Sequence, residues 1–246
     1  MNNRCIVFDL DGTIYFGNRP AYKANEVILR AKKVFEHVFF VTNNSAKTRE
    51  ELIEKLKSMD VDVSLDELIN SGFAVAKYLA ENGYNDVHCI GSDSLKTEIK
   101  SFGINIDTVE PKAVVVGYDP DFSLKDLTGI LNSKLDDFKL IIANRERNYP
   151  GKDGIIMPGA GPIVSAVENA LNKKTDVIVG KPNPLMLELI TEGLNLKPKD
   201  ICVVGDSYES DVMMAEAYGA SSVLIDKSKS HNCFTVEKLA DLLELF

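Results

Sequence analysis

Two carboxylates stand two residues apart near the start of the chain, directly after an apolar run. Asp9 and Asp11 follow Ile6-Val7-Phe8, and Gly12 and Thr13 come next. Residues i and i+2 of a strand point the same way, so both carboxylates can face one ligand where the strand opens into a loop. In open parallel sheets, ligands bind at this edge. The pair is therefore a candidate site, although a solvated turn uses the same residues.

A polar turn follows a second apolar run, Val38 to Val41. The turn is Thr42-Asn43-Asn44-Ser45, and a helical pattern begins just after it. Hydroxyls, amides and unpaired N–H groups at the start of a helix bind anions, so Thr42 and Asn43 are candidates for holding an anion. A plain N-cap made by Ser45 or Thr48 is the alternative.

A lysine follows a third run, in Gly180-Lys181-Pro182 after Val177-Ile178-Val179. A lysine at the end of a strand can neutralise the charge of a phosphate, although most lysines are simply solvated. The segment is not a P-loop, because Thr175 stands where that motif requires its first glycine.

A second acidic pair follows a fourth run, Ile201 to Val204. Asp206 and Asp211 flank the turn that begins at Gly205. Carboxylates together with a backbone carbonyl form the hard-oxygen site that Mg²⁺ prefers. A turn followed by an acidic N-cap is the alternative.

The elements that position these residues alternate along the chain. Short β-branched runs, the last of them Ser222 to Ile225, are separated by amphipathic helical patterns such as Thr48 to Met59 and Leu185 to Leu194. Such alternation predicts an α/β fold with a parallel sheet between helices.

The middle of the chain repeats this pattern on a smaller scale. Strands are predicted at His88 to Ile90, Ala113 to Val116 and Leu140 to Ala143, and helices at Leu124 to Leu131 and Ile163 to Leu171. We therefore predict a second domain over residues 82–178, inserted near Asn82-Gly83 and Lys173-Lys174 into a core of residues 1–81 and 179–246.

The composition restricts the partners. The 246 residues carry a formal net charge of −9, which repels nucleic acid and anionic membranes, so neither is expected as a partner. No apolar stretch approaches the roughly 20 residues that span a bilayer, and no signal-peptide layout precedes Ile6. Four scattered cysteines without a CxxC pair favour reduced, buried thiols. A cytoplasmic protein is expected.

Together the four segments resemble the motifs of the haloacid dehalogenase (HAD) superfamily. That family carries DxDG[TV], a Ser or Thr, a Lys and GDxxxxD in this order, and all four match here. The resemblance extends over nearly the whole chain to the NagD-type, or nitrophenyl-phosphatase-type, branch. Its further segments are Asn70 to Ala76, Val114 to Gly117, Pro158 to Pro162 and Gly180 to Pro184.

This resemblance implies a Rossmann-like, doubly wound parallel core sheet with an inserted α/β cap domain that selects the substrate. It implies a Mg²⁺-dependent phosphatase acting on a small-molecule phosphate monoester, such as a sugar phosphate or a nucleotide. Asp9 would be the nucleophile and Asp11 the general acid and base. Asp9, the Asp11 carbonyl and Asp206 would hold the metal. Thr42, Asn43 and Lys181 would bind phosphoryl oxygens, and Asp211 would orient waters around the metal or Lys181. Members of this branch often dimerise through the cap, so a homodimer is one option.

The cap departs from its relatives in one segment. Many members carry ATNxD after a cap strand, whereas this chain has Ala143-Asn144-Arg145-Glu146-Arg147, with Arg147 at the usual Asp position. A solvated loop is one interpretation. The other is that Asn144, Arg145 and Arg147 set substrate specificity, with an arginine favouring an anionic leaving group.

Other functions remain open. A phosphomutase uses the same aspartyl phosphate, and a non-catalytic Mg²⁺-binding receiver module would keep it, although Asp11 would hasten its hydrolysis. A dehalogenase has no use for Asp11 or the metal. Neither a dinucleotide site nor a serine hydrolase is supported, because Val164 replaces the third glycine of GxGxxG and no GxSxG occurs.

Overall fold

The computed structural model describes residues 3–150, 155–228 and 231–246 and divides the chain into two compact units. The first unit comprises Met1–Thr42, Arg49–Ile69 and Lys181–Phe246, and the second comprises Asn43–Thr48 and Asn70–Gly180. The insertion thus begins at residue 70 rather than at the predicted residue 82. The difference is helix α3 (Ser71–Glu81), which belongs to the second unit because it packs on α4 (Asp93–Ser101) there, with Phe73 against Phe102.

A six-stranded sheet forms the centre of the first unit, in the order β15-β14-β13-β1-β4-β5. Its strands are β1 (Cys5–Asp9), β4 (His37–Thr42), β5 (Leu68–Asn70), β13 (Ile201–Gly205), β14 (Ser221–Ile225) and β15 (Thr235–Val236). β1 pairs in parallel with both β4 and β13, and β13 continues in parallel to β14. The prediction of a parallel α/β core sheet is confirmed.

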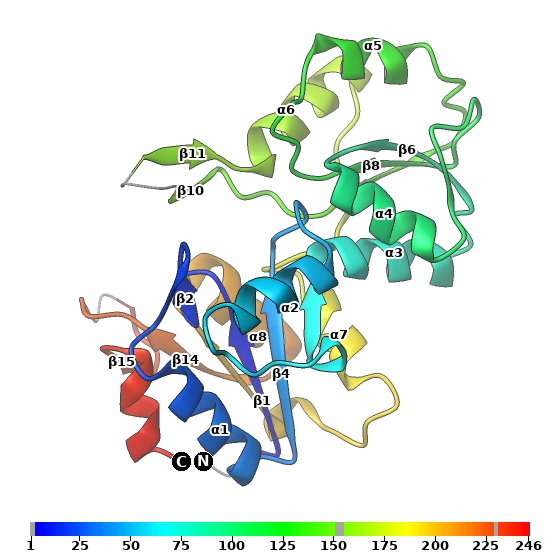
Figure 1. Ribbon diagram of the computed structural model, residues 1–246. Helices are drawn as coiled ribbons and strands as arrows, with labels where there is room; N and C mark the ends of the chain where they lie inside the picture. Colours follow the sequence, from blue (N-terminus) through cyan, green and yellow to red (C-terminus); the bar gives the residue numbers. More distant parts are fainter. Residues whose placement is uncertain (1–2, 151–154, 229–230) are drawn as a thin grey trace. The chain divides into compact units, whose positions relative to one another are not determined.

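The apolar runs form strands because both faces of the sheet are covered. Every residue of β1 is buried, and Phe8 stacks on Phe40 of β4 with ring centroids 5.8 Å apart. The covering helices are α1 (Ala24–Val34), α2 (Arg49–Lys57), α7 (Leu185–Thr191) and α8 (Met213–Tyr218). Each helix buries an apolar stripe, for example Leu52, Ile53 and Leu56 of α2. Figure 1 shows β1 running beside β4 in this unit.

Short elements complete the first unit. They are the paired strands β2 (Tyr15–Phe16) and β3 (Arg19–Pro20), the 3₁₀ helices at Leu65–Glu67, Pro198–Asp200 and Leu239–Glu244, and a π-helical turn at Tyr208–Val212. The strand order reverses its direction at β1 and β13, since the chain runs from β1 outward through β4 on one side and from β13 outward through β14 on the other. Such a switch point is where doubly wound sheets bind their ligands.

The second unit is built around a five-stranded parallel sheet of order β12-β9-β8-β6-β7. Its strands are β6 (Asp86–Ile90), β7 (Asn105–Ile106), β8 (Ala113–Val116), β9 (Lys139–Ile142) and β12 (Val177–Ile178). Helices α5 (Leu124–Leu131) and α6 (Ala160–Leu171) accompany α3 and α4, and β10 (Asn148–Pro150) pairs with β11 (Ile156–Pro158).

One strand lies in a different sheet from the one expected. If the four motif runs end at one sheet, the run Val177 to Val179 belongs beside the core strands, although residues 177 and 178 fall within the predicted insertion of residues 82–178. In the structure β12 pairs with β9 of the second unit, through Val177 beside Ile141 and Ile178 beside Ile142. A short apolar run fits either sheet, so its pairing partner was not encoded locally. Among the described residues, none of the helices has both the length and the apolar character that crossing a membrane requires.

Candidate functional site

Asp9 lies at the carboxyl end of the central strand β1 and is only 4% exposed. Its Oδ1 accepts a hydrogen bond from Nζ of Lys181 at 2.5 Å. Its Oδ2 is also buried but has no hydrogen-bond partner among the described residues. Buried carboxylate oxygens normally have partners, so this vacant acceptor marks a position where a ligand would bind.

Two further carboxylates gather around Asp9. One oxygen from each of Asp9, Asp206 and Asp211 lies within 4.8 Å of the others, and Oδ1 of Asp211 accepts a second hydrogen bond from Lys181 at 2.7 Å. Asp206 follows β13 directly, and the π-helical turn carries Asp211 back toward the strand end. The structure therefore brings Asp9, Lys181, Asp206 and Asp211 together, from segments far apart in the sequence.

Two glycines make this gathering possible. A Cβ on Gly12, whose φ is +91°, would lie 2.2 Å from Oδ2 of Asp206, and a Cβ on Gly205 would lie 2.1 Å from Oδ2 of Asp211. Both distances are far below any real contact. Glycine at these two positions lets the backbone approach the carboxylates closely.

The electrostatics of this group follow from burial and crowding. Burial, followed by the charges of Asp211 and Asp206, raises the pKa of Asp9 against the opposing effect of Lys181. Asp206 is the exposed member of the group, but partial shielding of its carboxylate from water, followed by the charge of Asp211, raises its pKa to about 6. Burial lowers the pKa of Lys181, but Asp211 and Asp9 outweigh it, so the lysine stays charged. The carboxylates repel one another, and one ammonium group does not offset them.

These residues fit a divalent cation. Three carboxylates face a single lysine, so the fully ionised group carries two negative charges in excess. The donors are hard oxygen atoms, which suit Mg²⁺ better than softer ligands would. Asp9 also offers an oxygen that no protein group uses. Asp211, which was expected to orient Lys181, contacts that lysine and also places a carboxylate oxygen in this group.

Asp11 is held separately from this group. Oδ2 of Asp11 accepts hydrogen bonds from the hydroxyl of Tyr15 at 2.8 Å and from the hydroxyl of Thr42 at 3.4 Å. Nζ of Lys55 lies 4.0 Å from Oδ1 of Asp11 and 3.7 Å from the centre of the Tyr15 ring. Burial, followed by the charge of Asp11, raises the pKa of Tyr15, so its hydroxyl remains a donor. Thr42 and Asp11 therefore meet as the strand-end argument expects.

The other candidates lie in the second unit, where Asn43, Asn144 and Arg145 contact neighbours in the same unit. The side-chain amide of Asn43 donates to Glu146 at 2.9 Å, and that of Asn144 donates to the carbonyl of Asn43 at 2.7 Å. Arg145 forms an ion pair with Glu168 at 2.6 Å, and Arg147 is exposed. Their proposed roles toward a substrate stay predictions.

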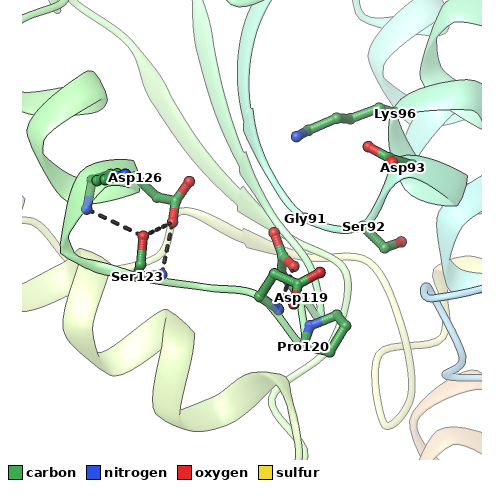
Figure 2. Close-up of a pocket in the computed structure, with 10 residues that line it drawn as sticks. Gly91, Ser92, Asp93, Lys96, Asp119, Pro120, Ser123 and Asp126 are labelled. Carbon is green, nitrogen blue, oxygen red and sulfur yellow. Dashed lines mark hydrogen bonds between the residues drawn. The ribbon is translucent and has the colours of Figure 1, made fainter.

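The second unit also has a hollow of about 340 Å³ at the carboxyl ends of β6 and β8. Figure 2 shows its lining, in which Ser123 and Asp126 are hydrogen-bonded to each other and Lys96 extends from α4. Asp119 accepts the backbone N–H of Asp121. In the part of the chain that the structure describes, these aspartates do not converge on one point as Asp9, Asp206 and Asp211 do. The polar groups of the hollow shape its loops.

Sequence reasoning missed two residues of the first unit. Tyr15 lies four residues after Asp11, inside an apolar stretch that gives no hint of its hydroxyl contact, and Lys55 lies on α2 as one of several lysines. Of the two, only Lys55 could have been noticed in the sequence, because a lysine on the half-buried side of an amphipathic helix is unusual.

Comparisons with known proteins agree with this geometry. A family model described as haloacid dehalogenase-like hydrolase matches residues 6–105, and a second, described as HAD-hydrolase-like, matches residues 178–240. The acid sugar phosphatase of Staphylococcus epidermidis is 30% identical, with 91% of this chain and 86% of the relative covered. Chronophin of Rattus norvegicus is 29% identical over 97% of this chain and 86% of its own.

The solved structures give the same result. The p-nitrophenyl phosphatase from Archaeoglobus fulgidus superposes with a TM-score of 0.89 at 28% identity and covers 100% of both chains. An acidic group with a lysine at the switch point of a doubly wound sheet defines a hydrolase of the HAD type. The chain belongs to the haloacid dehalogenase-like hydrolases, as the four motifs predicted.

Proposed function

We propose that this hydrolase is a Mg²⁺-dependent phosphatase that acts on a phosphate monoester of a small molecule, such as a sugar phosphate, a nucleotide or a similar metabolite. The observation that carries the proposal is the buried Oδ2 of Asp9, which has no partner among the described residues and lies at the carboxyl end of the central strand. The names of the relatives, two of them phosphatases, support the same chemistry.

Asp9 is the nucleophile in the first step. An oxygen of Asp9 forms a bond to phosphorus while the bond from phosphorus to the leaving-group oxygen breaks, and the electron pair of that bond stays on the leaving oxygen. Asp11, as the acid, gives its proton to that oxygen. The product alcohol leaves, and an aspartyl phosphate remains on Asp9.

Asp11 reverses its role in the second step. As a carboxylate it takes a proton from a water molecule while the water oxygen attacks phosphorus. The bond from phosphorus to Asp9 breaks, which frees inorganic phosphate and restores both carboxyl groups. Acid–base assistance of this kind contributes about 10²–10⁴ in rate.

Other residues bind the phosphoryl group and the metal. Lys181, Thr42 and Asn43 are assigned to the phosphoryl oxygens, where a positive charge and polar hydrogens stabilise the spreading negative charge. Asp9, Asp206 and the backbone carbonyl of Asp11 would hold Mg²⁺, and Asp211 either joins them or orients Lys181. When bound, the cation neutralises the repulsion between a carboxylate and a phosphate dianion.

The remaining expectations belong to this proposal. The partner is a small phosphate ester, with no nucleic acid and no membrane, because the net charge of −9 repels both. The cytoplasm fits four cysteines that are all free, three of them buried. A homodimer remains an option. A phosphomutase and a phospho-acceptor module are the alternatives, and they differ from a phosphatase in what becomes of the aspartyl phosphate.

The proposed phosphatase activity is tested by measuring the inorganic phosphate that the protein releases. The purified protein is incubated with Mg²⁺ and p-nitrophenyl phosphate, and then with a panel of phosphorylated metabolites. We expect steady turnover that EDTA abolishes and Mg²⁺ restores. Asp9→Asn should lower kcat by about 10⁴-fold or more, whereas Asp62→Asn, a change at an exposed site of the same unit, should not alter it.

The alternatives give different products. Isomerised sugar phosphate without free phosphate would identify a mutase, and a single stable phosphorylation would identify an acceptor module. Substantial turnover by Asp9→Asn would rule out the covalent mechanism. Full activity in EDTA would remove the metal from it.

A further inference from the structure

The carboxylate of Asp11 is held by a tyrosine of its own loop. The hydroxyl of Tyr15 donates to Oδ2 at 2.8 Å, and the Tyr15 side chain is fully buried although the Asp11 side chain is half exposed. The hydroxyl of Thr42 approaches the same oxygen at 3.4 Å. Two hydroxyl groups thus engage Oδ2, and this leaves Oδ1 as the oxygen that can carry a transferable proton.

The backbone fixes this contact. The N–H of Gly12 donates to the carbonyl of Tyr15 at 2.8 Å, and the N–H of Tyr15 donates to the carbonyl of Leu10 at 3.1 Å. This tight turn needs the positive φ of Gly12. Because the ring is buried and both neighbouring peptide groups are bonded, the hydroxyl of Tyr15 has little freedom to move away from Asp11.

A lysine from another element supports the arrangement. Lys55 of α2 places its Nζ 3.7 Å from the centre of the Tyr15 ring and 4.0 Å from Oδ1 of Asp11. The ring face attracts a cation, and the lysine charge lies near the carboxylate without a direct hydrogen bond at that distance. Lys55 therefore contacts both members of the pair.

We propose that Tyr15, supported by Lys55, is a positioning residue that fixes the orientation of Asp11 and determines which of its oxygens delivers the proton to the leaving group. The inference rests on the proposed phosphatase function and deepens it. Tyr15 touches neither the substrate nor the reacting phosphorus. In kcat/KM, which reports the steps up to the departure of the product alcohol, its effect is confined to the transfer of the proton from Asp11 to the departing oxygen.

An effect on this proton transfer alone predicts that kcat/KM depends on the basicity of the leaving group. p-Nitrophenolate is a weak base and leaves without much help from an acid, whereas phenolate is a stronger base and needs the proton. Phenyl phosphate and p-nitrophenyl phosphate are otherwise nearly the same size. A misplaced Asp11 therefore slows the hydrolysis of phenyl phosphate and spares that of p-nitrophenyl phosphate. General damage to the site slows the hydrolysis of both esters equally.

The test is kcat/KM for both esters in Tyr15→Phe, which removes only the hydroxyl. We expect a loss of about 10- to 100-fold with phenyl phosphate, the size of a small misplacement, and less than about threefold with p-nitrophenyl phosphate. Tyr22→Phe is the matched control, because Tyr22 is an exposed tyrosine with Lys23 near its ring. It should change neither value.

A variant of Lys55 tests the same proposal without changing Tyr15. Lys55→Met should show the same ester dependence with a smaller loss, and Lys57→Met, at an exposed lysine of the same helix, should not. Activity on p-nitrophenyl phosphate itself reports that each variant is folded. Equal losses on both esters, or no loss on either, in an active enzyme would overturn the role of Tyr15 and leave the phosphatase in place. A wild-type protein without phosphatase activity would overturn both.

Discussion

Each unit of the molecule buries a carboxylate beside a cationic side chain, but the two are used differently. Glu168 in the second unit is 6% exposed and accepts hydrogen bonds from Arg145 at 2.6 and 3.3 Å and from the N–H and hydroxyl of Thr175 at 2.8 Å each. Asp9 in the first unit is 4% exposed, accepts one hydrogen bond from Lys181, and retains one oxygen without a partner among the described residues.

The contrast appears in their acidities. The hydrogen bond from Arg145 is the largest effect on Glu168, and with those from Thr175 it lowers the pKa of Glu168 despite burial. Burial and like charges raise the pKa of Asp9. A buried carboxylate with all its partners stabilises the fold, whereas one with a vacant oxygen and like-charged neighbours costs stability and is suited to bind a ligand.

The sharpest test of this contrast is Asp206→Asn. Removal of this carboxylate should lower kcat/KM by about 10³-fold, because the proposed metal site loses an oxygen ligand and its charge. The metal-free protein should nevertheless be as stable as the wild type or slightly more so, by at most about 1 kcal/mol, because Asp206 is exposed and solvent screens the repulsion that is relieved. Urea unfolding in EDTA measures this. A clear loss of stability would contradict the view that the acidic group is strained by repulsion.

Lys181→Met should strongly destabilise the first unit. It leaves Asp9 and Asp211 buried without their common partner, which typically costs about 3–5 kcal/mol. Denaturant midpoints measured with and without Mg²⁺ check this, and Mg²⁺ should recover part of the loss. An unchanged midpoint would show that the lysine serves only the substrate.

Glu168→Gln tests the other side of the comparison. It should destabilise the protein by about 1–3 kcal/mol at pH 7 while it leaves kcat on p-nitrophenyl phosphate nearly unchanged. Because the pKa of Glu168 in the folded protein is lowered from 4.5, its stabilisation is present above that value and is lost as the pH falls through the lower folded pKa. The difference between wild type and variant should therefore be smaller at pH 3 than at pH 7.

A matched control lies in the same unit. Glu110 pairs with Lys134, but both side chains are mostly exposed. Glu110→Gln should leave the unfolding midpoint close to that of the wild type, since solvent screens such pairs. If the exposed pair mattered as much as the buried one, burial would not explain the role of Glu168.

The smallest effect is expected at Arg147. This side chain is exposed, whereas its neighbour Arg145 is anchored by Glu168. If Arg147 contacts the leaving group, Arg147→Ala should reduce the preference for a carboxylated over a neutral phosphate ester by about fivefold, roughly 1 kcal/mol, with stability unchanged. Ratios of kcat/KM for the two esters measure it. An unchanged ratio would favour the solvated loop.

Much of the first unit could be predicted from the sequence because its signals are local. β-Branched runs such as Ile6 to Phe8 become strands where helices cover both faces of the sheet. A motif residue that directly follows such a strand lies at the carboxyl end of the strands, where these sheets bind ligands. The gathering of Asp9 with Asp206 and the contact of Thr42 with Asp11 could be expected on this ground. The pairing of β12 with β9 could not be, because a two-residue strand carries no preference for one sheet over another.

The sequence by itself determined the residue types, their order and the strands that end in them, and with these the family and the class of chemistry. The tertiary structure decided which charges meet. Lys181 lies between Asp9 and Asp211, Tyr15 turns its hydroxyl to Asp11, and Arg145 is occupied by Glu168. Hydrogen bonds and ion pairs act over a few ångströms in space, so partners far apart in the chain become visible only when the fold brings them together.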